Sequence, residues 1–181
     1  VPLAENKLGQ RLNEAQPATH DWQRKHWTTL QQSYATGPHV AEMLALVESV
    51  FAAGHASLAG LSAASMEALA DSFEVMPETV LRSSEMAAIE GVGSERVLAI
   101  CRELGAKRYV TGQGAADYLD HAAFDEAGIA VEYMDYEKRA YPQLHGDFTP
   151  FVSALDLLAN CGQAGRDVIA PRTVCWKDFV K

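Results

Sequence analysis

The middle of the chain constrains its fold more than any other part of the sequence. A helix-like stretch at 94–104, with Ser94 placed to cap it, leads into a strand-like run at 107–111. A second helix-like stretch at 115–126 then leads into a second strand-like run at 129–135. Two strands joined through one helix form a right-handed crossover and pair in parallel. The pattern therefore predicts an α/β fold with a parallel, Rossmann-like sheet.

Three amphipathic stretches come before this segment and predict a helical annex over 22–74. In each of them apolar residues recur at helical spacing. The expected helices cover 22–34, 39–53 and 60–73, and Asp21 is placed to cap the first of them.

The annex is expected to precede a sheet segment at 79–162. This segment opens with a short β-like run at 79–84 and closes with a helix at 148–160. The remainder, 163–181, shows no clear period and is expected to be an irregular C-terminal tail. At this length the whole chain, 1–181, is expected to form a single α/β domain.

The charge of the chain argues against several classes of partner. The chain has 15 Lys and Arg residues and 24 Asp and Glu residues, so its net charge is −9. A non-specific nucleic-acid binder is instead basic. An anionic membrane surface would also repel the chain, and no apolar run reaches the ~18–20 residues of a membrane span. Between His26 and Leu81 there are six carboxylates and no Lys or Arg, which fits a solvated face or a docking face for a basic partner. We expect no nucleic acid and no membrane as partners.

The cysteines and histidines give no support to a metal centre. Cys101, Cys161 and Cys175 are scattered, and none belongs to a C-x-x-C pair. They are expected to be small buried apolar residues in a reducing compartment. The six histidines are isolated, and no dinucleotide or Walker fingerprint is complete. The sequence thus predicts a cytoplasmic protein with no metal and no cofactor.

A cationic pair stands between two tryptophans at the start of the first expected helix. Lys25 and His26 lie between Trp22 and Trp27. Successive helical residues point about 100° apart, so both members of the pair cannot face the core. One interpretation is a solvated turn with the tryptophans buried. The other makes Lys25 an anion clamp and His26 a proton shuttle or phosphate contact.

Two polar turns are expected where strands end, which is the edge at which open α/β sheets bind ligands. Hydroxyls and a guanidinium at the first turn suit a phosphate or sulfate. At the second, glycines let a ligand approach the backbone, and the following helix N-terminus favours an anion. The candidate substrate-binding residues are Arg82, Ser83 and Ser84 at the first turn and Thr111, Gly112, Gln113, Gly114 and Tyr118 at the second. The alternative is that both are ordinary turn and cap residues.

A third candidate is the loop before the last expected helix. It carries Tyr141, Gln143, His145 and Asp147, and its prolines and glycine restrict its shape. These side chains are placed to converge on a substrate. Asp156 follows within the helix, between apolar neighbours, where a carboxylate is costly unless it caps or pairs. The alternative for Asp156 is a hydrogen bond to a neighbouring loop N–H.

Taken in their order and spacing, several of these pieces resemble the WbqC-like family of bacterial proteins. The likeness covers roughly residues 20–162, within which 39–78 matches only in helical character. The matching pieces are Trp22–Trp27 with Tyr34 and Pro38, Ser83–Glu85, Arg96–Ala106, Tyr109–Leu119, Tyr141–Gln143 and Phe148–Gly162.

The resemblance implies a small biosynthetic enzyme of surface-polysaccharide (O-antigen) or natural-product pathways. Its substrate would be a small activated anionic metabolite, an amino-sugar or amino-acid derivative, and its reaction group transfer or displacement. Together with the residue types, this assigns the anion clamp to Lys25. General acid/base work falls to His26, with Asp147 or Asp156 orienting it.

The resemblance also implies a strand and an aromatic turn that would come before Val1. A second protein chain that supplies this segment is therefore an expected partner. The alternative function is a non-catalytic subunit that completes the active site of a partner protein in such a pathway. The anionic annex would suit that alternative.

Overall fold

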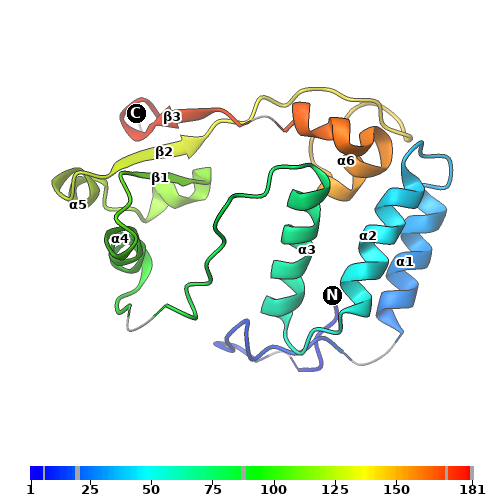
Figure 1. The fold of residues 1–181 in the computed structure, drawn as a ribbon, viewed down its shortest axis with the longest axis horizontal. Coiled ribbons are helices and arrows are strands. Elements are labelled where there is room, and N and C mark those ends of the chain that lie inside the picture. Colours follow the sequence, from blue (N-terminus) through cyan, green and yellow to red (C-terminus); the bar gives the residue numbers. More distant parts are fainter. Residues whose placement is uncertain (6, 19–20, 87–88, 170, 180–181) are drawn as a thin grey trace. The chain divides into compact units, whose positions relative to one another are not determined.

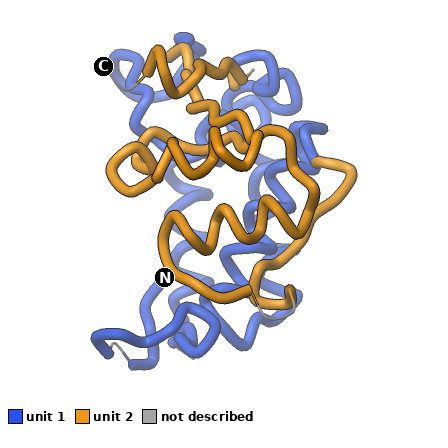
Figure 2. Tube along the Cα trace, turned by 90° about the vertical axis from the view of Figure 1, so that its left-hand side faces the viewer, with its two compact units in different colours: residues 1–76, 139–168 blue, residues 77–138, 169–181 orange. Residues whose placement is uncertain are grey.

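The computed structural model describes residues 1–181 except 6, 19–20, 87–88, 170 and 180–181. The chain divides into two compact units, each built from two separate stretches of sequence. Unit 1 comprises Val1–Met76 and Arg139–Val168, and unit 2 comprises Pro77–Lys138 and Ile169–Lys181 (Figure 2). The expected sheet segment 79–162 is thus shared between the units. That the whole chain behaves as a single domain stays a prediction.

Unit 1 is helical, as expected of the annex. Its elements are α1 (Trp22–Ser33), α2 (Val40–Ala52), α3 (Leu58–Ser72), α6 (Ala154–Cys161) and the 3-10 helix η2 (Gly162–Asp167) (Figure 1). The first three helices confirm the predicted helices to within two residues at either end. Helix α2 contacts α1, α3 and α6 and is therefore the centre of the unit.

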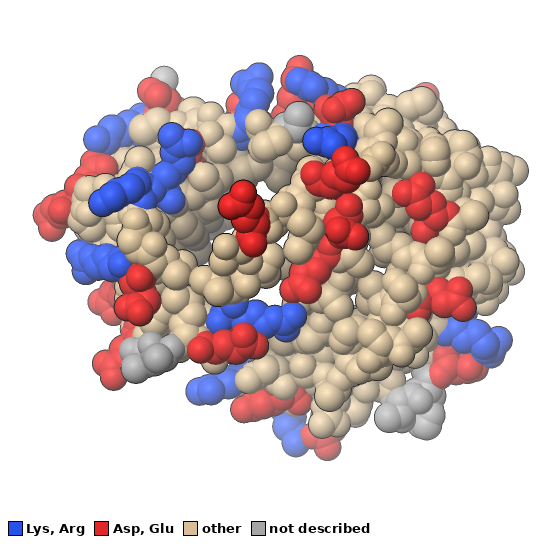
Figure 3. All heavy atoms as spheres, in the orientation of Figure 1, with Lys and Arg blue, Asp and Glu red and all other residues tan. Residues whose placement is uncertain are grey.

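The core of unit 1 follows from the spacing of apolar residues in α2. Met43, Val47 and Val50 recur on one face of the helix and are all buried. Phe73 and Leu158, which are 1% and 0% exposed, are also buried in unit 1, as are Leu61 and Leu157. On the face that Figure 3 draws, acidic side chains are spread over the surface that holds α2 and α3. That this surface docks a basic partner stays a prediction.

Unit 2 holds a small mixed sheet with the order β1-β2-β3. Strand β1 (Arg108–Thr111) pairs in parallel with β2 (Ala130–Met134), as the sequence predicts. Strand β3 (Thr173–Cys175) pairs antiparallel to β2. The chain is therefore α/β, but only one of the two pairings is parallel. The expectation of a parallel, Rossmann-like sheet is not confirmed.

Helices cover the sheet of unit 2 and share its core. They are α4 (Gly93–Glu103), the 3-10 helix η1 (Gln113–Asp117), α5 (His121–Glu126) and α7 (Trp176–Phe179). Phe124 of α5 and Val131 and Tyr133 of β2 are almost fully buried. The rings of Phe179 and Tyr133 stack at a centroid distance of 4.5 Å, so α7 packs on β2.

Two expectations about strands were wrong. The run 79–84 is not a strand: its residues are exposed, and a turn begins where the amide of Glu85 donates to the carbonyl of Arg82. The run is too polar on both faces to hold a pairing partner. The tail 163–181 is not irregular, because η2, β3 and α7 lie within it; residues 170 and 180–181 are outside the described part.

Three helix boundaries also differ, each because a capping group lies elsewhere. The expected helix 115–126 is split, since the Asp120 carboxylate accepts from the amide of Ala123 and starts α5 there. The expected helix 148–160 begins only at Ala154, after Ser153 caps the amide of Leu155. The Ser94 hydroxyl lies inside the first turn of α4 and accepts from the amide of Asp120 instead of capping.

In the described part of the chain, no helix combines the length and the apolar character needed to cross a membrane. Nor do the described His, Cys, Asp and Glu residues gather in any group of three or more that could hold a metal ion.

Candidate functional site

The most elaborate polar network in unit 1 is centred on the buried carboxylate of Asp156, which is 7% exposed. The hydroxyl of Tyr34 donates to its Oδ1 at 2.9 Å. The hydroxyl of Tyr141 and Nε2 of Gln143 donate to its Oδ2 at 2.7 and 3.1 Å. Asp156 therefore pairs with two loop side chains and with the C-cap of α1.

The side-chain amide of Gln143 is held by hydrogen bonds at both its oxygen and its nitrogen. Its Oε1 accepts from the amide N–H of Thr149, and its Nε2 donates to the carbonyl of Thr149 at 3.0 Å. The side chain therefore closes the loop between Gln143 and Thr149 and presents its N–H to Asp156. Within the third candidate, Tyr141, Gln143 and Asp156 are brought together, whereas the exposed Asp147 takes no part in these hydrogen bonds.

The pKa values of the two phenols that contact Asp156, those of Tyr34 and Tyr141, are shifted. Burial, together with the hydrogen bond to Asp156, raises the pKa of Tyr34 to about 12. The same causes raise the pKa of Tyr141 further, although its contact with Gln143 opposes the rise. Both phenols are protonated at neutral pH and act as donors, so the buried charge is stabilised by hydrogen bonds.

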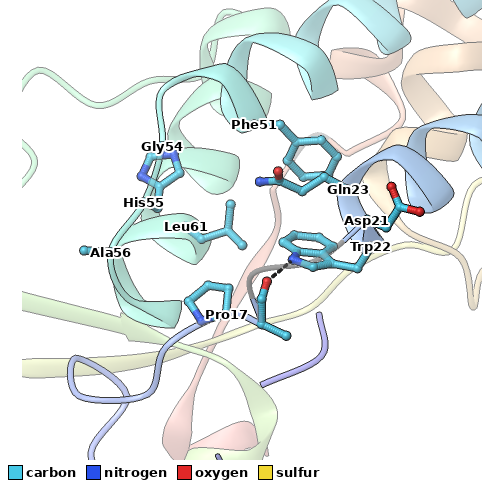
Figure 4. A pocket seen from close by; sticks show the side chains of 10 residues that line it. Pro17, Asp21, Trp22, Gln23, Phe51, Gly54, His55, Ala56 and Leu61 are labelled. Atoms are coloured by element: carbon cyan, nitrogen blue, oxygen red, sulfur yellow. Dashed lines mark hydrogen bonds between the residues drawn. The ribbon is translucent and has the colours of Figure 1, made fainter. Parts of the chain in front are cut away.

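A cavity of about 450 Å³ lies beside the N-terminal end of α1. Figure 4 shows its wall of Trp22, Phe51 and Leu61, with the Gln23 amide directed between them. Pro17 and His55 complete the edge. We call this the polar-edged cavity, because the Gln23 amide, the His55 imidazole and the Asp21 carboxylate border it beside its apolar wall. Its size lies in the range of about 300–1,000 Å³ that is typical of small-molecule sites.

The aromatic wall of this cavity is held in place. The indole Nε1 of Trp22 donates to the carbonyl of Ala18 at 2.9 Å, and the Phe51 ring meets the indole edge-on at a centroid distance of 5.2 Å. Asp21 occupies the N-cap position of α1 as expected, and its carbonyl accepts from the amide of Lys25. Its side chain makes no capping hydrogen bond: the residue adopts φ +38°, and the carboxylate binds the Arg24 guanidinium at 2.7 and 2.9 Å.

A second cavity, of about 220 Å³, shares Trp22, Phe51 and Leu61 with the first. We call it the apolar cavity. Aliphatic side chains of α2, α3 and α6 form most of its walls, and His26 lies among its lining residues. The His26 ring is 6.0 Å from the Phe51 ring, centroid to centroid.

His26 has the protonation state that a general base needs. Partial burial of the ring, and after it the positive charge of the N-terminus, lowers the pKa of the imidazole below its ordinary value, although the residue as a whole is exposed. The ring is therefore mostly neutral at pH 7. Among the described residues, neither ring nitrogen has a hydrogen-bond partner, so both are available to a ligand. The neighbouring Lys25 is exposed and lines neither cavity.

The other candidate residues lie in unit 2. Arg82, Ser83 and Ser84 are exposed at the turn that begins near 83, and Arg96 holds this turn by donating to the carbonyls of Ser83 and Ile89. The turn does not follow a strand, which removes the strand-end argument for it.

The glycine turn keeps its place at the end of β1. The Thr111 hydroxyl accepts from Tyr109, and Nε2 of Gln113 donates to the carbonyl of Met134, at the end of β2. A Cβ at Gly112 or Gly114 would meet nothing within 4 Å, so the backbone there is open. Only the five-residue η1 follows, with Tyr118 exposed as its C-cap, so the expected dipole of a full helix is missing.

The predicted site residues thus fall in both units, and each group has been described in its own unit. That one ligand meets both groups stays a prediction. Sequence reasoning missed the Gln23, Phe51 and His55 borders of the cavities. It also missed Tyr34 as a partner of Asp156, since nothing local signals a hydrogen bond across 122 positions.

Comparison with known proteins gives two matches. The model of the WbqC-like protein family matches residues 1–168. The "Uncharacterized protein Rv1507c" of Mycobacterium tuberculosis (strain ATCC 25618 / H37Rv) is 31% identical over 172 residues, which cover 93% of this chain and 74% of that protein. No solved structure matches the chain.

Proposed function

The chain belongs to the WbqC-like protein family, and from that premise we propose that it is a biosynthetic enzyme that transfers or displaces a group on a small activated metabolite. The proposed pathway classes are surface-polysaccharide and natural-product biosynthesis. The metabolite is an amino-sugar or amino-acid derivative with an anionic part.

The observation that supports this proposal most is the state of His26. A neutral imidazole with no hydrogen-bond partner among the described residues borders a cavity of unit 1. Such a ring can accept the proton of an attacking hydroxyl or amine while the new bond forms, and the leaving group departs with its electron pair. A properly placed general base contributes about 10²–10⁴-fold to the rate.

The polar-edged cavity is the proposed place for the metabolite in unit 1. Gln23 can donate and accept hydrogen bonds there, and Trp22 and Phe51 offer apolar faces. Neither cavity has Lys or Arg in its lining, so the anionic part of the substrate needs another binding group. For that part we propose Lys25 of unit 1. As a separate anion-binding site within unit 2 we propose the open backbone at Gly112 and Gly114.

A screen tests the proposal in two steps. Nucleotide sugars and amino-acid derivatives are tested for thermal stabilisation of the chain, and those that stabilise it are followed by mass spectrometry for turnover. His26→Gln is expected to keep the melting temperature and to lower turnover at least 100-fold. The matched control is Gln32→Ala, an exposed position on the same helix, which is expected to leave turnover unchanged. Equal turnover by His26→Gln and the wild type would overturn the assignment.

The alternative, a non-catalytic subunit, predicts a different outcome of the same work. No compound would be turned over by the chain alone. Co-expression with proteins encoded beside its gene would yield a stable complex, and turnover would appear only in that complex. Size-exclusion chromatography of the chain alone and of the co-expressed proteins separates the two functions.

A further inference from the structure

The side chains of the apolar cavity favour an uncharged guest. The lining includes no Lys, Arg, Asp or Glu side chain, and most of it consists of Leu and Val side chains. Val1 also lines the cavity, and the charge of its amino group acts on His26. A charge placed among aliphatic side chains without a partner loses several kcal/mol of solvation or more, so we expect an uncharged, mainly apolar occupant.

The polar side chains of the cavity lining differ in how far they are already hydrogen-bonded. The Ser65 hydroxyl donates to the carbonyl of Ser62 at 2.9 Å, and the Ser153 hydroxyl accepts from the amide of Leu155 at 3.2 Å. Each hydroxyl thus already makes one hydrogen bond within the chain. His26 is the side chain of this lining whose polar atoms have no partner among the described residues. The guest is expected to make its hydrogen bond there.

The dimensions and the rings of the cavity indicate the kind of apolar group. An apolar protein cavity of ~150 Å³ is enough to hold benzene. The volume here, about 220 Å³, leaves room for one ring and a small substituent. Trp22, His26 and Phe51 all line it, and they already pack edge-on or tilted against one another. A further ring can join them with the same geometry, which favours aromatic pairs.

We propose that the apolar cavity binds a neutral phenolic ring whose hydroxyl donates a hydrogen bond to the His26 imidazole. The inference rests on the proposed function and deepens it, because it names the chemical class of one of the two reacting groups: an aryl hydroxyl that His26 can deprotonate. The polar-edged cavity, which shares the Trp22–Phe51 wall, remains the place of the other group.

Binding of three probes to the full chain tests the inference without any turnover. Phenol, toluene and benzoate are titrated by NMR at pH 7.5. Phenol is expected to bind about five- to tenfold more tightly than toluene, as one hydrogen bond allows, and benzoate more weakly than both. In His26→Phe the advantage of phenol over toluene is expected to disappear.

A cavity-filling variant shows where the probes bind. Ser65→Leu places a larger side chain in the apolar cavity and is expected to weaken phenol at least tenfold. Ser62→Leu, three residues earlier on α3 and exposed, adds the same side chain outside the cavity and is expected to change nothing. If Ser65→Leu does not fold, which circular dichroism shows, His26→Phe alone decides.

Two results would overturn the inference: benzoate binding as tightly as phenol, or phenol binding unaffected by either cavity variant. These results leave the proposed function standing if His26→Gln still abolishes turnover of a screened metabolite. The reverse outcome is also distinguishable. If phenol binds as expected but turnover does not need His26, the proposed function is overturned and the proposed phenol-binding site still stands.

Discussion

The hydroxyl of Tyr141 donates to the carboxylate of Asp156 at 2.7 Å, and so ties the loop before α6 to a buried residue of that helix. Tyr34 donates to the other oxygen of the same carboxylate from the end of α1. One buried carboxylate therefore joins the end of α1, 122 positions away, to α6 and to the loop before it. The geometry makes Asp156 a structural anchor of unit 1, and its orienting role toward His26 stays a prediction.

Removal of this anchor is expected to destabilise the fold strongly. Asp156→Ala leaves Tyr34, Tyr141 and Gln143 without their acceptor and is expected to lower the free energy of unfolding by about 3–5 kcal/mol. Tyr141→Phe removes one donor and is expected to cost about 1.5–3 kcal/mol. Urea denaturation measures both. The control is Asp147→Ala, an exposed carboxylate of the same loop, expected to stay within about 0.5 kcal/mol.

The lowered pKa of His26 predicts how stability changes with pH. Above the ordinary value of ~6.5, the ring is neutral in both states and contributes nothing. As the pH falls through that value, the unfolded chain takes up the proton first, so stability falls until the lowered folded pKa is passed. His26→Gln is expected to flatten this part of the curve when urea midpoints at pH 7.5 and 5.5 are compared. A steeper loss in the variant would contradict the assigned direction.

A glycine in unit 1 is needed for close packing. A Cβ at Gly165 would lie 2.7 Å from Cε1 of Phe73 and 2.8 Å from Cγ of Leu157. Gly165→Ala is therefore expected to cost about 1–3 kcal/mol, because overpacking a core forces its side chains to move. Gly114→Ala, where a Cβ meets nothing within 4 Å, is the control and is expected to have the melting temperature of the wild type.

The open turn after β1 allows a test of anion binding that does not disturb the fold. Gly112 has φ −74° and space for a Cβ, so Gly112→Ala is expected to fold normally. If an anion approaches the backbone there, the added methyl group is expected to weaken pyrophosphate binding about tenfold, as calorimetry would show. Unchanged affinity in the folded variant would remove this turn from the proposed site.

The sequence predicts best what depends on local signals. Apolar residues such as Met43, Val47 and Val50 mark α2, and the two strand-like runs on either side of α5 mark the parallel pair β1 and β2. Helix boundaries differ from the predicted ones where a capping residue has more than one possible hydrogen-bond partner. Ser94 was expected to cap its own helix, but its hydroxyl accepts from Asp120, 26 positions away.

Pairing across long distances is what the sequence does not show. Strand β3 is three residues long, and it forms because it can pair with the backbone of Glu132, Tyr133 and Met134 in β2. No pattern within such a short stretch signals a strand. In the candidate site, the cost of a buried Asp156 was foreseeable, while its partner Tyr34 was not. The cavities likewise depend on how Trp22 packs against Phe51, which local periodicity does not determine.

The central claim is that His26 is a neutral acid/base group that lines a ligand-binding cavity of unit 1. The ring-nitrogen NMR signals of His26, recorded at pH 7 with and without saturating phenol, test it most directly. The account predicts the pattern of a neutral imidazole in the free chain and a shift of one ring nitrogen when phenol binds. A protonated ring in the free chain, or bound phenol that leaves both nitrogens unmoved, would contradict it.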